Sequence, residues 1–401
     1  MPGGAVIIGG GQAGGVAAAS LREQGYADTI TLVAAEPHLP YQRPPLSKNY
    51  LAGQMSAQQV LLKAAAFYTE KSINVVTATR ALSIDRTDGV VRLSDAGALP
   101  YDVLLLATGA RPRTIDLPGA SLAGVHYLRT LADVDAIRSR MADGKRLVVI
   151  GGGYIGLEVA AVARQAGLQV TVLEYADRIL GRVTGETVAG FVADTHRARG
   201  VDIQCGVRVE AVVGTAQVES VACAHAEFPA DLVVVGIGVV PNSELAAEAG
   251  LKTGNGIHVD EYCRTEDPHI YAAGDCTNHP NALLGRRVRL ESVQNAVDQA
   301  RAAAANMRGT PKIYRELPWF WSNQYDLRLQ MAGVSDGHDR TLLRGDPAQP
   351  SFSVLYLRAD ALIAADTVNA PREHLALRKL IAQGAALDID KLCNPAIPLP
   401  A

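Results

Sequence analysis

The sequence predicts an α/β fold with two similar domains, the second inserted into the first, followed by a smaller α+β domain. Two kinds of apolar run support this prediction, because each occurs twice. A run that passes into a glycine-rich turn occupies residues 5–14 and again 147–156. A run that ends in glycine, with proline three residues later, occupies residues 103–112 and again 232–241. Continuous apolar runs of this length are typical of strands buried in a parallel sheet.

Each glycine-rich turn has the spacing G-x-G-x-x-G, and a helix, a second strand and a glutamate follow it in order. In such a unit the first glycine makes the tight turn, the second lets the backbone approach a pyrophosphate, and the third packs the helix on the strand. The helix amino terminus offers N–H groups to the phosphates, and the glutamate accepts hydrogen bonds from the adenosine ribose. The repeat therefore predicts two Rossmann-like dinucleotide-binding domains. These residues are Gly9, Gly11, Gly14 and Glu36 in the first copy, and Gly151, Gly153, Gly156 and Glu174 in the second.

The order of the remaining segments predicts the domain boundaries. A short strand that ends in Gly274-Asp275 comes after the second copy is complete, which indicates that the first domain resumes there. After residue 317, apolar and polar residues alternate, strand-like runs cover 352–358 and 361–367, and a helix is expected over 372–383. Strands in which apolar and polar residues alternate, followed by a helix, favour an α+β domain. The expected domains are residues 1–112 with 242–317, residues 113–241, and residues 318–401.

Composition excludes several classes of protein. The 401 residues include 38 basic and 41 acidic ones, a net charge of −3, which argues against a nucleic-acid-binding protein with a strongly basic surface. No apolar run approaches the roughly 18 residues that a membrane helix needs. The amino-terminal residues carry no cationic segment and no cleavage site, so we expect a cytoplasmic protein with no membrane contact.

The five cysteines are widely spaced, and none precedes Cys205. Because they include no C-x-x-C pair, the sequence predicts neither a disulfide framework nor a zinc site. We expect each to be a small buried apolar side chain. The cysteines are Cys205, Cys223, Cys263, Cys276 and Cys393.

Several segments together resemble one family, the NADH-dependent ferredoxin reductases. They are the two glycine motifs, Tyr-Gln-Arg-Pro-Pro-Leu-Ser-Lys at 41–48, Ala-Thr-Gly at 107–109, Tyr-Ala-Ala-Gly-Asp at 271–275 and Pro-Trp-Phe-Trp-Ser at 318–322. These FAD flavoproteins serve bacterial cytochromes P450 and ring-hydroxylating dioxygenases. The resemblance covers essentially the whole chain, and it implies a glutathione-reductase-like fold without redox cysteines.

The resemblance implies that FAD lies on the first domain. Asp275 matches a residue that holds the ribityl and pyrophosphate region, and Trp321 matches an aromatic side chain packed against the flavin. A cation at Lys48 would stabilise the anionic reduced ring. The residues expected to bind FAD are Gly9, Gly11, Gly14, Glu36, Arg43, Lys48, Thr108, Gly109, Arg111, Gly274, Asp275 and Trp321.

The second domain is then expected to bind NADH. A carboxylate at Glu174 favours the 2′-hydroxyl of NADH over the 2′-phosphate of NADPH, although Arg178 lies four residues further on. Glu158 matches a family position near the contact of flavin and nicotinamide, and with Lys48 it forms the expected catalytic pair. The residues expected to bind NADH are Gly151, Gly153, Ile155, Gly156, Glu158, Glu174 and Gly238.

By this resemblance the enzyme takes a hydride from NADH on its FAD and passes single electrons to a [2Fe–2S] ferredoxin. No metal is expected. Relatives that reduce disulfides or peroxides use a cysteine beside the flavin, and this chain has none before residue 205. Two alternatives remain open. One is a reductase of a small acceptor such as a quinone or monodehydroascorbate. The other is a redox-signalling flavoprotein similar to apoptosis-inducing factor, which shares the R-P-P-L-S-K segment and Glu158.

The expected partner is an acidic ferredoxin that forms a transient complex, with the reductase a monomer or a weak dimer. Complementary basic residues would steer it. The first candidates are Arg286, Arg287 and Arg289, and further ones are Arg301, Arg308, Lys312 and Arg315. The sequence identifies neither the ferredoxin nor its terminal oxygenase.

Overall fold

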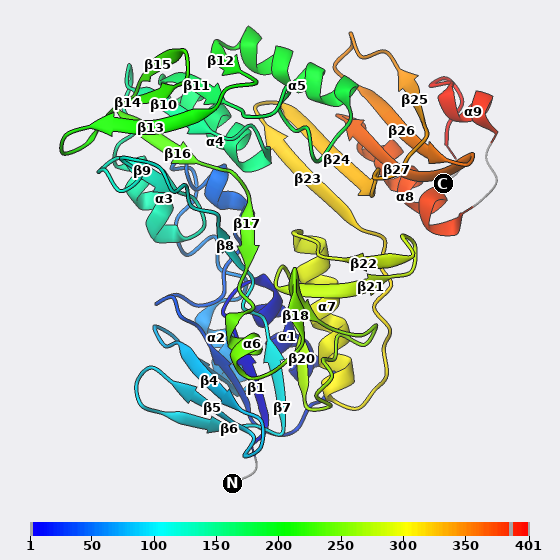
Figure 1. Ribbon diagram of the computed structural model, residues 1–401. Coiled ribbons are helices and arrows are strands. Elements are labelled where there is room, and N and C mark those ends of the chain that lie inside the picture. Colours follow the sequence, from blue (N-terminus) through cyan, green and yellow to red (C-terminus); the bar gives the residue numbers. More distant parts are fainter. Residues whose placement is uncertain (1–2, 385–387, 400–401) are drawn as a thin grey trace. The chain divides into compact units, whose positions relative to one another are not determined.

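A computed structural model describes residues 3–384 and 388–399, which pack into two compact units (Figure 1). The first unit contains residues up to 42, 57–111 and 240–318. The second contains residues 43–56, 112–239 and those from 319 on. The segment 43–56, which lies within the range 1–112 expected to bind FAD, thus packs in the second unit.

The first unit is built on a five-stranded parallel sheet. Its strands are β20 (Ile270–Ala272), β7 (Val103–Leu106), β1 (Ala5–Ile8), β2 (Ile30–Val33) and β3 (Ile73–Val76), in that spatial order. Every residue of β1 is buried, because a parallel sheet is covered on both faces. On one face pack α1 (Gln12–Glu23) and α7 (Val293–Met307), whose alanines allow the two helices to approach closely.

Smaller elements complete the first unit. The antiparallel sheet of β4, β5 and β6 and the four-stranded sheet of β18, β19, β21 and β22 lie outside the parallel sheet. Strands β8 and β17 pair with each other where the chain passes between the units. The bounds are α2 (Ala65–Glu70), β4 (Ala81–Asp85), β5 (Val90–Leu93), β6 (Ala98–Pro100), β8 (Ala110–Pro112), β17 (Val239–Pro241), α6 (Glu244–Glu248), β18 (Thr253–Gly254), β19 (Gly256–His258), β21 (Thr277–Asn281) and β22 (Arg286–Val288).

The second unit repeats the parallel sheet. Its strands are β12 (Val201–Gln204), β11 (Gln169–Leu173), β10 (Arg146–Ile150), β16 (Leu232–Val235) and β9 (Val125–Tyr127), in that spatial order. Strand β10 pairs with β11 and β16 as β1 pairs with β2 and β7, so the two apolar repeats form equivalent buried strands. The predicted α/β fold is confirmed. The other elements here are η1 (Pro44–Ser47), α3 (Leu131–Arg138), α4 (Tyr154–Gln165), α5 (Glu186–Ala198), β13 (Val209–Gly214), β14 (Val218–Cys223) and β15 (Ala226–Pro229).

The carboxy-terminal residues form an antiparallel sheet within the second unit. Its spatial order is β23-β24-β27-β26-β25, and α8 packs on β24 and β27. The predicted strands and the predicted helix are found there, with Pro371 at the first turn of α8. The bounds are β23 (Trp319–Gln324), β24 (Leu327–Gly333), β25 (Arg340–Gly345), β26 (Phe352–Arg358), β27 (Ala361–Val368), α8 (Pro371–Gln383) and α9 (Ile389–Cys393).

Within the described residues, no helix is long and apolar enough to cross a membrane. In the same part of the chain, no cluster of three or more His, Cys, Asp or Glu side chains could hold a metal ion. All five cysteines are free thiols.

Candidate functional site

The first glycine turn connects β1 to α1 and is closed by backbone contact. Gly9 has φ +122°, and a Cβ there would lie 2.1 Å from the carbonyl oxygen of Ala107, the residue directly after β7. A Cβ at Gly14 would lie 1.9 Å from the carbonyl oxygen of Gly9. Both positions therefore require glycine. By contrast Gly11 has φ −89°, and no described heavy atom would lie within 4 Å of a Cβ there.

This open space lies at the amino terminus of α1. Gly11 is the N-cap, and among the described residues no side chain caps the helix and no acid stands in its first turn. The first N–H groups of a helix have no partner inside the helix, and they carry partial positive charge. A glycine with room in front of it and uncapped N–H groups fit a pyrophosphate, as FAD would present.

Other residues expected at the FAD site gather at the same end of this sheet. Gly274 follows β20, and a Cβ on it would lie 3.2 Å from the Cβ of Ala13 in α1. The buried Gln299 side chain accepts a hydrogen bond from the Gly274 N–H at 2.8 Å, which fixes the turn before the half-buried Asp275. The carboxyl ends of parallel strands meet at one edge, so β1, β7 and β20 bring these segments together.

Glu36 and Thr108 are held by neighbours within the first unit. The buried Tyr41 hydroxyl donates to Glu36 Oε2 at 2.5 Å, which orients the carboxylate beyond β2. The Thr108 hydroxyl donates to the Asn242 carbonyl at 2.6 Å, and Gly109 beside it has φ +65°. Arg111 donates to the Asn242 side chain at 2.9 Å. Tyr41 and Asn242 were not among the predicted site residues, although Tyr41 opens the quoted 41–48 segment.

Arg43, Lys48 and Trp321 belong to the second unit. Arg43 donates to the carbonyl of Arg129 at 2.5 Å. The Trp321 ring lies 5.5 Å from the ring of Trp319 within β23. Their expected roles toward FAD stay predictions.

Glu158 on α4 is the centre of a buried polar cluster. It is 2% exposed, and its Oε2 lies 2.5 Å from Lys48 Nζ. The Ser47 hydroxyl donates to Oε2 as well, and the Ser322 hydroxyl donates to Oε1 at 2.6 Å. Removing a carboxylate from water is costly unless a cation and hydrogen-bond donors compensate it, and here both are present. Helix α4, the end of η1 with Lys48 directly after it, and strand β23 therefore meet at the Glu158 carboxylate.

The structure brings together the two residues predicted to be catalytic, Lys48 and Glu158, which lie 110 positions apart. Ser47 and Ser322 were missed. Both stand in the motifs that carried the family resemblance, one beside Lys48 and one after Trp321, but the sequence alone does not show that a serine there faces a carboxylate.

The Lys48–Glu158 pair gives a stability prediction. Lys48→Met leaves the Glu158 carboxylate buried without its cation, so we expect a loss of about 2 kcal/mol in the free energy of unfolding, less than for a fully buried pair because Lys48 is partly exposed. A double variant with Glu158→Gln removes the uncompensated charge and should recover much of the loss. Urea denaturation of wild type, Lys48→Met, Glu158→Gln and the double variant measures both effects. An unchanged midpoint for the single variant would contradict the pairing.

The second glycine turn connects β10 to α4 in the same way. A Cβ at Gly151, which has φ +107°, would lie 2.5 Å from the Gly236 carbonyl oxygen, and one at Gly156 would lie 2.2 Å from the Gly151 carbonyl oxygen. Gly153 is the N-cap of α4, and no described side chain caps it. Ile155 is 43% exposed in the first helical turn. The turn therefore also fits a pyrophosphate.

Glu174 lies directly after β11, at the edge of this turn. Its Oε2 accepts the Gly152 N–H at 2.7 Å, and its Oε1 accepts the Ala176 N–H at 2.8 Å. Arg178, whose position weakened the predicted preference for NADH, donates to the carbonyls of Thr184 and Gly181 at 3.0 and 3.2 Å. The carboxylate is thus held in place, while the guanidinium is engaged by the backbone of its own loop.

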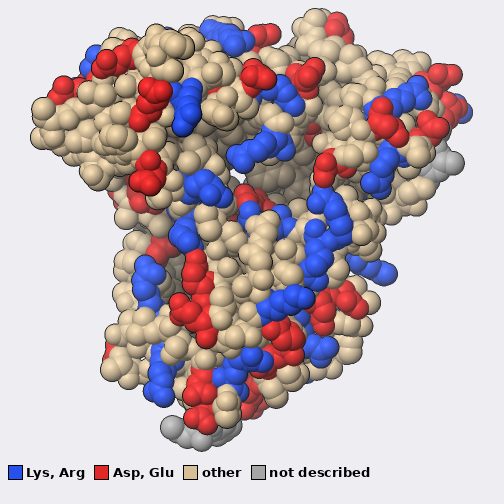
Figure 2. Space-filling model, viewed as in Figure 1, with Lys and Arg blue, Asp and Glu red and all other residues tan. Residues whose placement is uncertain are grey.

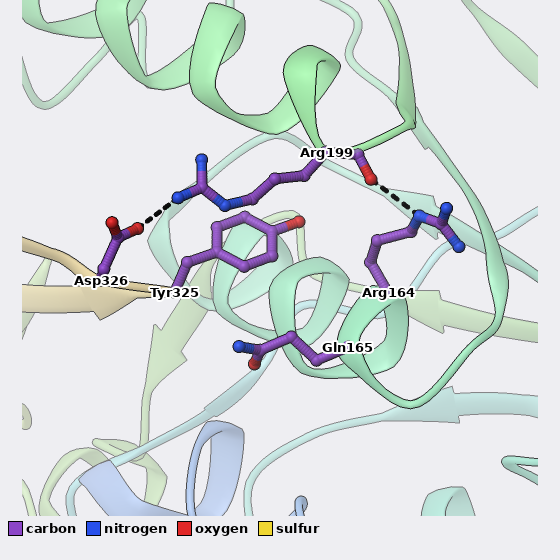
Figure 3. Close-up of a pocket in the computed structure, with 5 residues that line it drawn as sticks. All are labelled: Arg164, Gln165, Arg199, Tyr325 and Asp326. Atoms are coloured by element: carbon purple, nitrogen blue, oxygen red, sulfur yellow. Dashed lines mark hydrogen bonds and ion pairs between the residues drawn. The ribbon is translucent and has the colours of Figure 1, made fainter.

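A cavity elsewhere in the second unit contains none of the predicted site residues (Figure 3). It lies at the carboxyl end of α4, whereas the glycine turn is at the other end. Arg199 pairs with Asp326 and stacks over the Tyr325 ring at 4.6 Å, while Arg164 donates to the Arg199 carbonyl at 2.8 Å. One ion pair and one hydrogen bond to the backbone thus connect α4, the residue after α5 and the β23–β24 hairpin around this cavity.

Comparison with known proteins decides the family. Residues 4–300 match the family described as pyridine nucleotide-disulphide oxidoreductase, and residues 319–401 match the reductase C-terminal family. The chain belongs to the pyridine nucleotide-disulphide oxidoreductase family.

Individual members of this family match along the whole chain. Rhodocoxin reductase of Rhodococcus erythropolis is 47% identical over 94% of this chain and 89% of its own. The ferredoxin–NAD(+) reductase component of the anthranilate 1,2-dioxygenase system of Burkholderia cepacia is 45% identical over 98% of both. Putidaredoxin reductase in its covalent complex with putidaredoxin is 43% identical, with a TM-score of 0.96 over 99% of this chain and 97% of its own. The resemblance to ferredoxin reductases is confirmed.

In this pyridine nucleotide-disulphide oxidoreductase two of the five cysteines are buried as expected, whereas Cys205, Cys223 and Cys393 are partly exposed. Cys263 and Cys276 are buried, and burial raises the pKa of both thiols. Burial also raises the pKa of Cys205, which lies after the second glycine turn. Because the thiolate is the nucleophilic form, these groups are poor relays for electrons or disulfide exchange.

Proposed function

We propose that this chain is an FAD-dependent NADH:ferredoxin reductase that supplies a [2Fe–2S] ferredoxin of a cytochrome P450 or a ring-hydroxylating dioxygenase. The observation that carries the proposal is the presence of two open glycine turns, uncapped among the described residues, in one chain whose first cysteine is Cys205. A relative named as the ferredoxin–NAD(+) reductase component of a dioxygenase system matches over 98% of this chain. In this proposal residues 1–112 and 242–317 bind FAD, residues 113–241 bind NADH, and residues 318–401 form the third domain.

Bound FAD would supply the two-electron and one-electron chemistry that links NADH to a ferredoxin. The chain contributes binding and electrostatics. The amino termini of α1 and α4 bind the two pyrophosphates, Glu36 and Glu174 bind the adenosine riboses, and the Lys48 ammonium supplies positive charge, held by Glu158.

Glu174 sets the preference for NADH. Both of its oxygens are oriented by backbone N–H groups, so the carboxylate is presented in a fixed position. Charge repulsion opposes a 2′-phosphate there, and the Arg178 guanidinium is engaged by loop carbonyls. Tyr175, which follows Glu174, is 76% exposed and offers no guanidinium or ammonium group to a 2′-phosphate.

Basic side chains gather in the region of the β21–β22 hairpin (Figure 2). Of the three arginines predicted to attract the ferredoxin, Arg289 is largely buried and lies 2.6 Å from Glu291. Arg287 donates to the Val259 carbonyl at 2.8 Å but is exposed overall, as is Arg286. The exposed charge of this group therefore lies on Arg286 and Arg287.

Reversing that charge tests the docking surface. With Arg286→Glu and Arg287→Glu combined, we expect the KM for ferredoxin to rise about tenfold at low salt, and the difference to shrink at high salt as charges are screened. NADH–ferricyanide activity should be unchanged, since it needs no protein partner. Combined charge reversal at Arg80 and Arg92, two exposed arginines of the same unit that are not among the predicted candidates, serves as a matched control. Equal loss of both activities would reject the surface.

The test of the function is spectroscopic and kinetic. The purified holoprotein should be yellow, should bleach when NADH is added anaerobically, and should then reduce a [2Fe–2S] ferredoxin with saturation kinetics. A quinone or monodehydroascorbate turned over more efficiently would favour a small-acceptor reductase. A long-lived NADH-treated species that fails to pass electrons to ferredoxin would favour a signalling flavoprotein. Either result overturns the proposal.

A cytoplasmic location and a monomeric or weakly dimeric state belong to the same proposal. Five free cysteines in one chain are typical of a reducing compartment, where NADH is also available.

A further inference from the structure

A buried carboxyl group in the carboxy-terminal sheet contacts the second nucleotide-binding domain. Asp366 on β27 is 5% exposed. It accepts hydrogen bonds from the Tyr356 hydroxyl at 2.7 Å and from the Thr184 hydroxyl. The N–H of Gly185, the N-cap of α5, donates to the Tyr356 hydroxyl at 3.0 Å. The two sheet residues thus bind the Thr184 side chain and the Gly185 backbone N–H, which are consecutive at the start of α5.

These contacts leave little freedom at the start of α5. A Cβ at Gly185 would lie 2.6 Å from the Tyr356 hydroxyl oxygen, so the ring packs directly on the backbone. Among the described residues, no Lys, Arg or His pairs with Asp366, and burial raises the pKa of this carboxyl to about 6. A buried polar group without a cation depends on its hydroxyl donors, so losing one is costly.

Thr184 ends the loop that runs from Glu174 to α5, and this loop lies on the second glycine turn. The Leu180 N–H donates to the Gly152 carbonyl at 2.9 Å. A Cβ at Gly152 would lie 2.7 Å from a side-chain carbon of Ile179. A nitrogen of the Arg182 guanidinium lies 3.7 Å from where a Cβ on Gly238 would be, and Gly238 comes three residues after the end of β16. The loop therefore touches both strand ends at which NADH is proposed to bind.

We propose that Asp366 and Tyr356 are positioning residues that hold the loop 175–184 in its NADH-binding conformation. The carboxy-terminal domain would thereby set the affinity of a site formed by another domain. The inference rests on the proposed function, because it takes the second glycine turn to be the NADH site. Asp366 acts through Thr184, and Tyr356 acts through Gly185; neither is assigned a contact with the coenzyme.

The test measures NAD⁺ binding to the oxidised holoprotein by calorimetry, which requires no turnover. Thr184→Val and Tyr356→Phe are each expected to raise the Kd for NAD⁺ about five- to twentyfold, and the KM for NADH in parallel. The kcat at saturating NADH and the FAD content should stay within twofold. Thr184→Ser keeps the hydroxyl and should restore binding. Tyr325→Phe is the matched control, because the Tyr325 hydroxyl is buried and has no partner among the described residues.

Hydrogen exchange of the loop gives a second readout. Residues 175–184 should exchange at least threefold faster in Tyr356→Phe than in wild type, while the peptide of α1 is unchanged. If the variants fold less stably but bind NAD⁺ as tightly as wild type, the two residues only support the fold and the inference is overturned. If wild type itself binds no NAD⁺ while its FAD is intact, the proposed function fails. The exchange data then still show whether the contacts hold the loop.

Discussion

A Gly11→Val variant is expected to fold and to purify without FAD. Its backbone conformation, φ −89° and ψ −163°, is one that valine adopts readily, and no described atom lies within 4 Å of the new Cβ. The added methyls would instead occupy the space in front of the α1 amino terminus, where the pyrophosphate must approach. Losing those contacts, worth about 3 kcal/mol, corresponds to about a hundredfold weaker binding.

Two measurements test this prediction together. Absorbance at 450 nm reports the flavin content, and circular dichroism reports whether the protein is folded. Gly190→Ala is a matched control, because Gly190 also has open space around it, on α5. That variant should keep its flavin. Gly14→Val should instead fail to fold, since its Cβ would meet the Gly9 carbonyl oxygen at 1.9 Å. A yellow Gly11→Val protein would place the pyrophosphate elsewhere.

Glu174→Arg is expected to shift the coenzyme preference toward NADPH. The variant loses the carboxylate that accepts the ribose hydroxyl of NADH, and it gains a guanidinium that can pair with a 2′-phosphate. Hydrogen bonds to charged groups are worth about 1.5–3 kcal/mol each, and one is lost for NADH while one is gained for NADPH. The ratio of kcat/KM for NADH over NADPH should therefore fall at least about 100-fold. Steady-state kinetics with ferricyanide as acceptor measures the ratio without a protein partner.

The control separates the lost contact from a disturbed turn. Glu174 also accepts the Gly152 and Ala176 N–H groups, and Glu174→Gln keeps the acceptor for one of them. That variant should weaken NADH binding about tenfold without gaining NADPH. An unchanged ratio in Glu174→Arg would mean that this strand end does not bind the adenosine ribose.

The sequence was sufficient to predict the fold class, because its signals are local. A glycine with positive φ, an apolar run buried on both faces and a glutamate at a strand end are each encoded within a few residues. The duplication then placed β1 and β10, with their partner strands, in equivalent positions. The grouping of 43–56 with the second unit was not predicted, because it depends on long-range packing rather than on chain order.

Only part of the candidate site was predicted, because its contacts also depend on long-range packing. Lys48 and Glu158 were named from family motifs, but their ion pair joins residues 110 positions apart, and Ser322 lies 164 positions from Glu158. No periodicity or spacing in the sequence indicates such a contact. The hydrogen bonds of Arg178 to its own loop could not be predicted from the sequence either. They engage the guanidinium whose position in the sequence had weakened the predicted preference for NADH.

By itself the sequence determined that two strand–glycine–helix units exist, since backbone sterics allow few residues other than glycine in those turns, and that an acid follows the second strand of each. Only the tertiary structure decided which distant side chains neutralise the buried charge of Glu158 and which hydroxyls hold Asp366 against α5. The physical reason is that a buried polar group must find its partners wherever the packed core brings them, and the core is assembled from segments far apart in the chain.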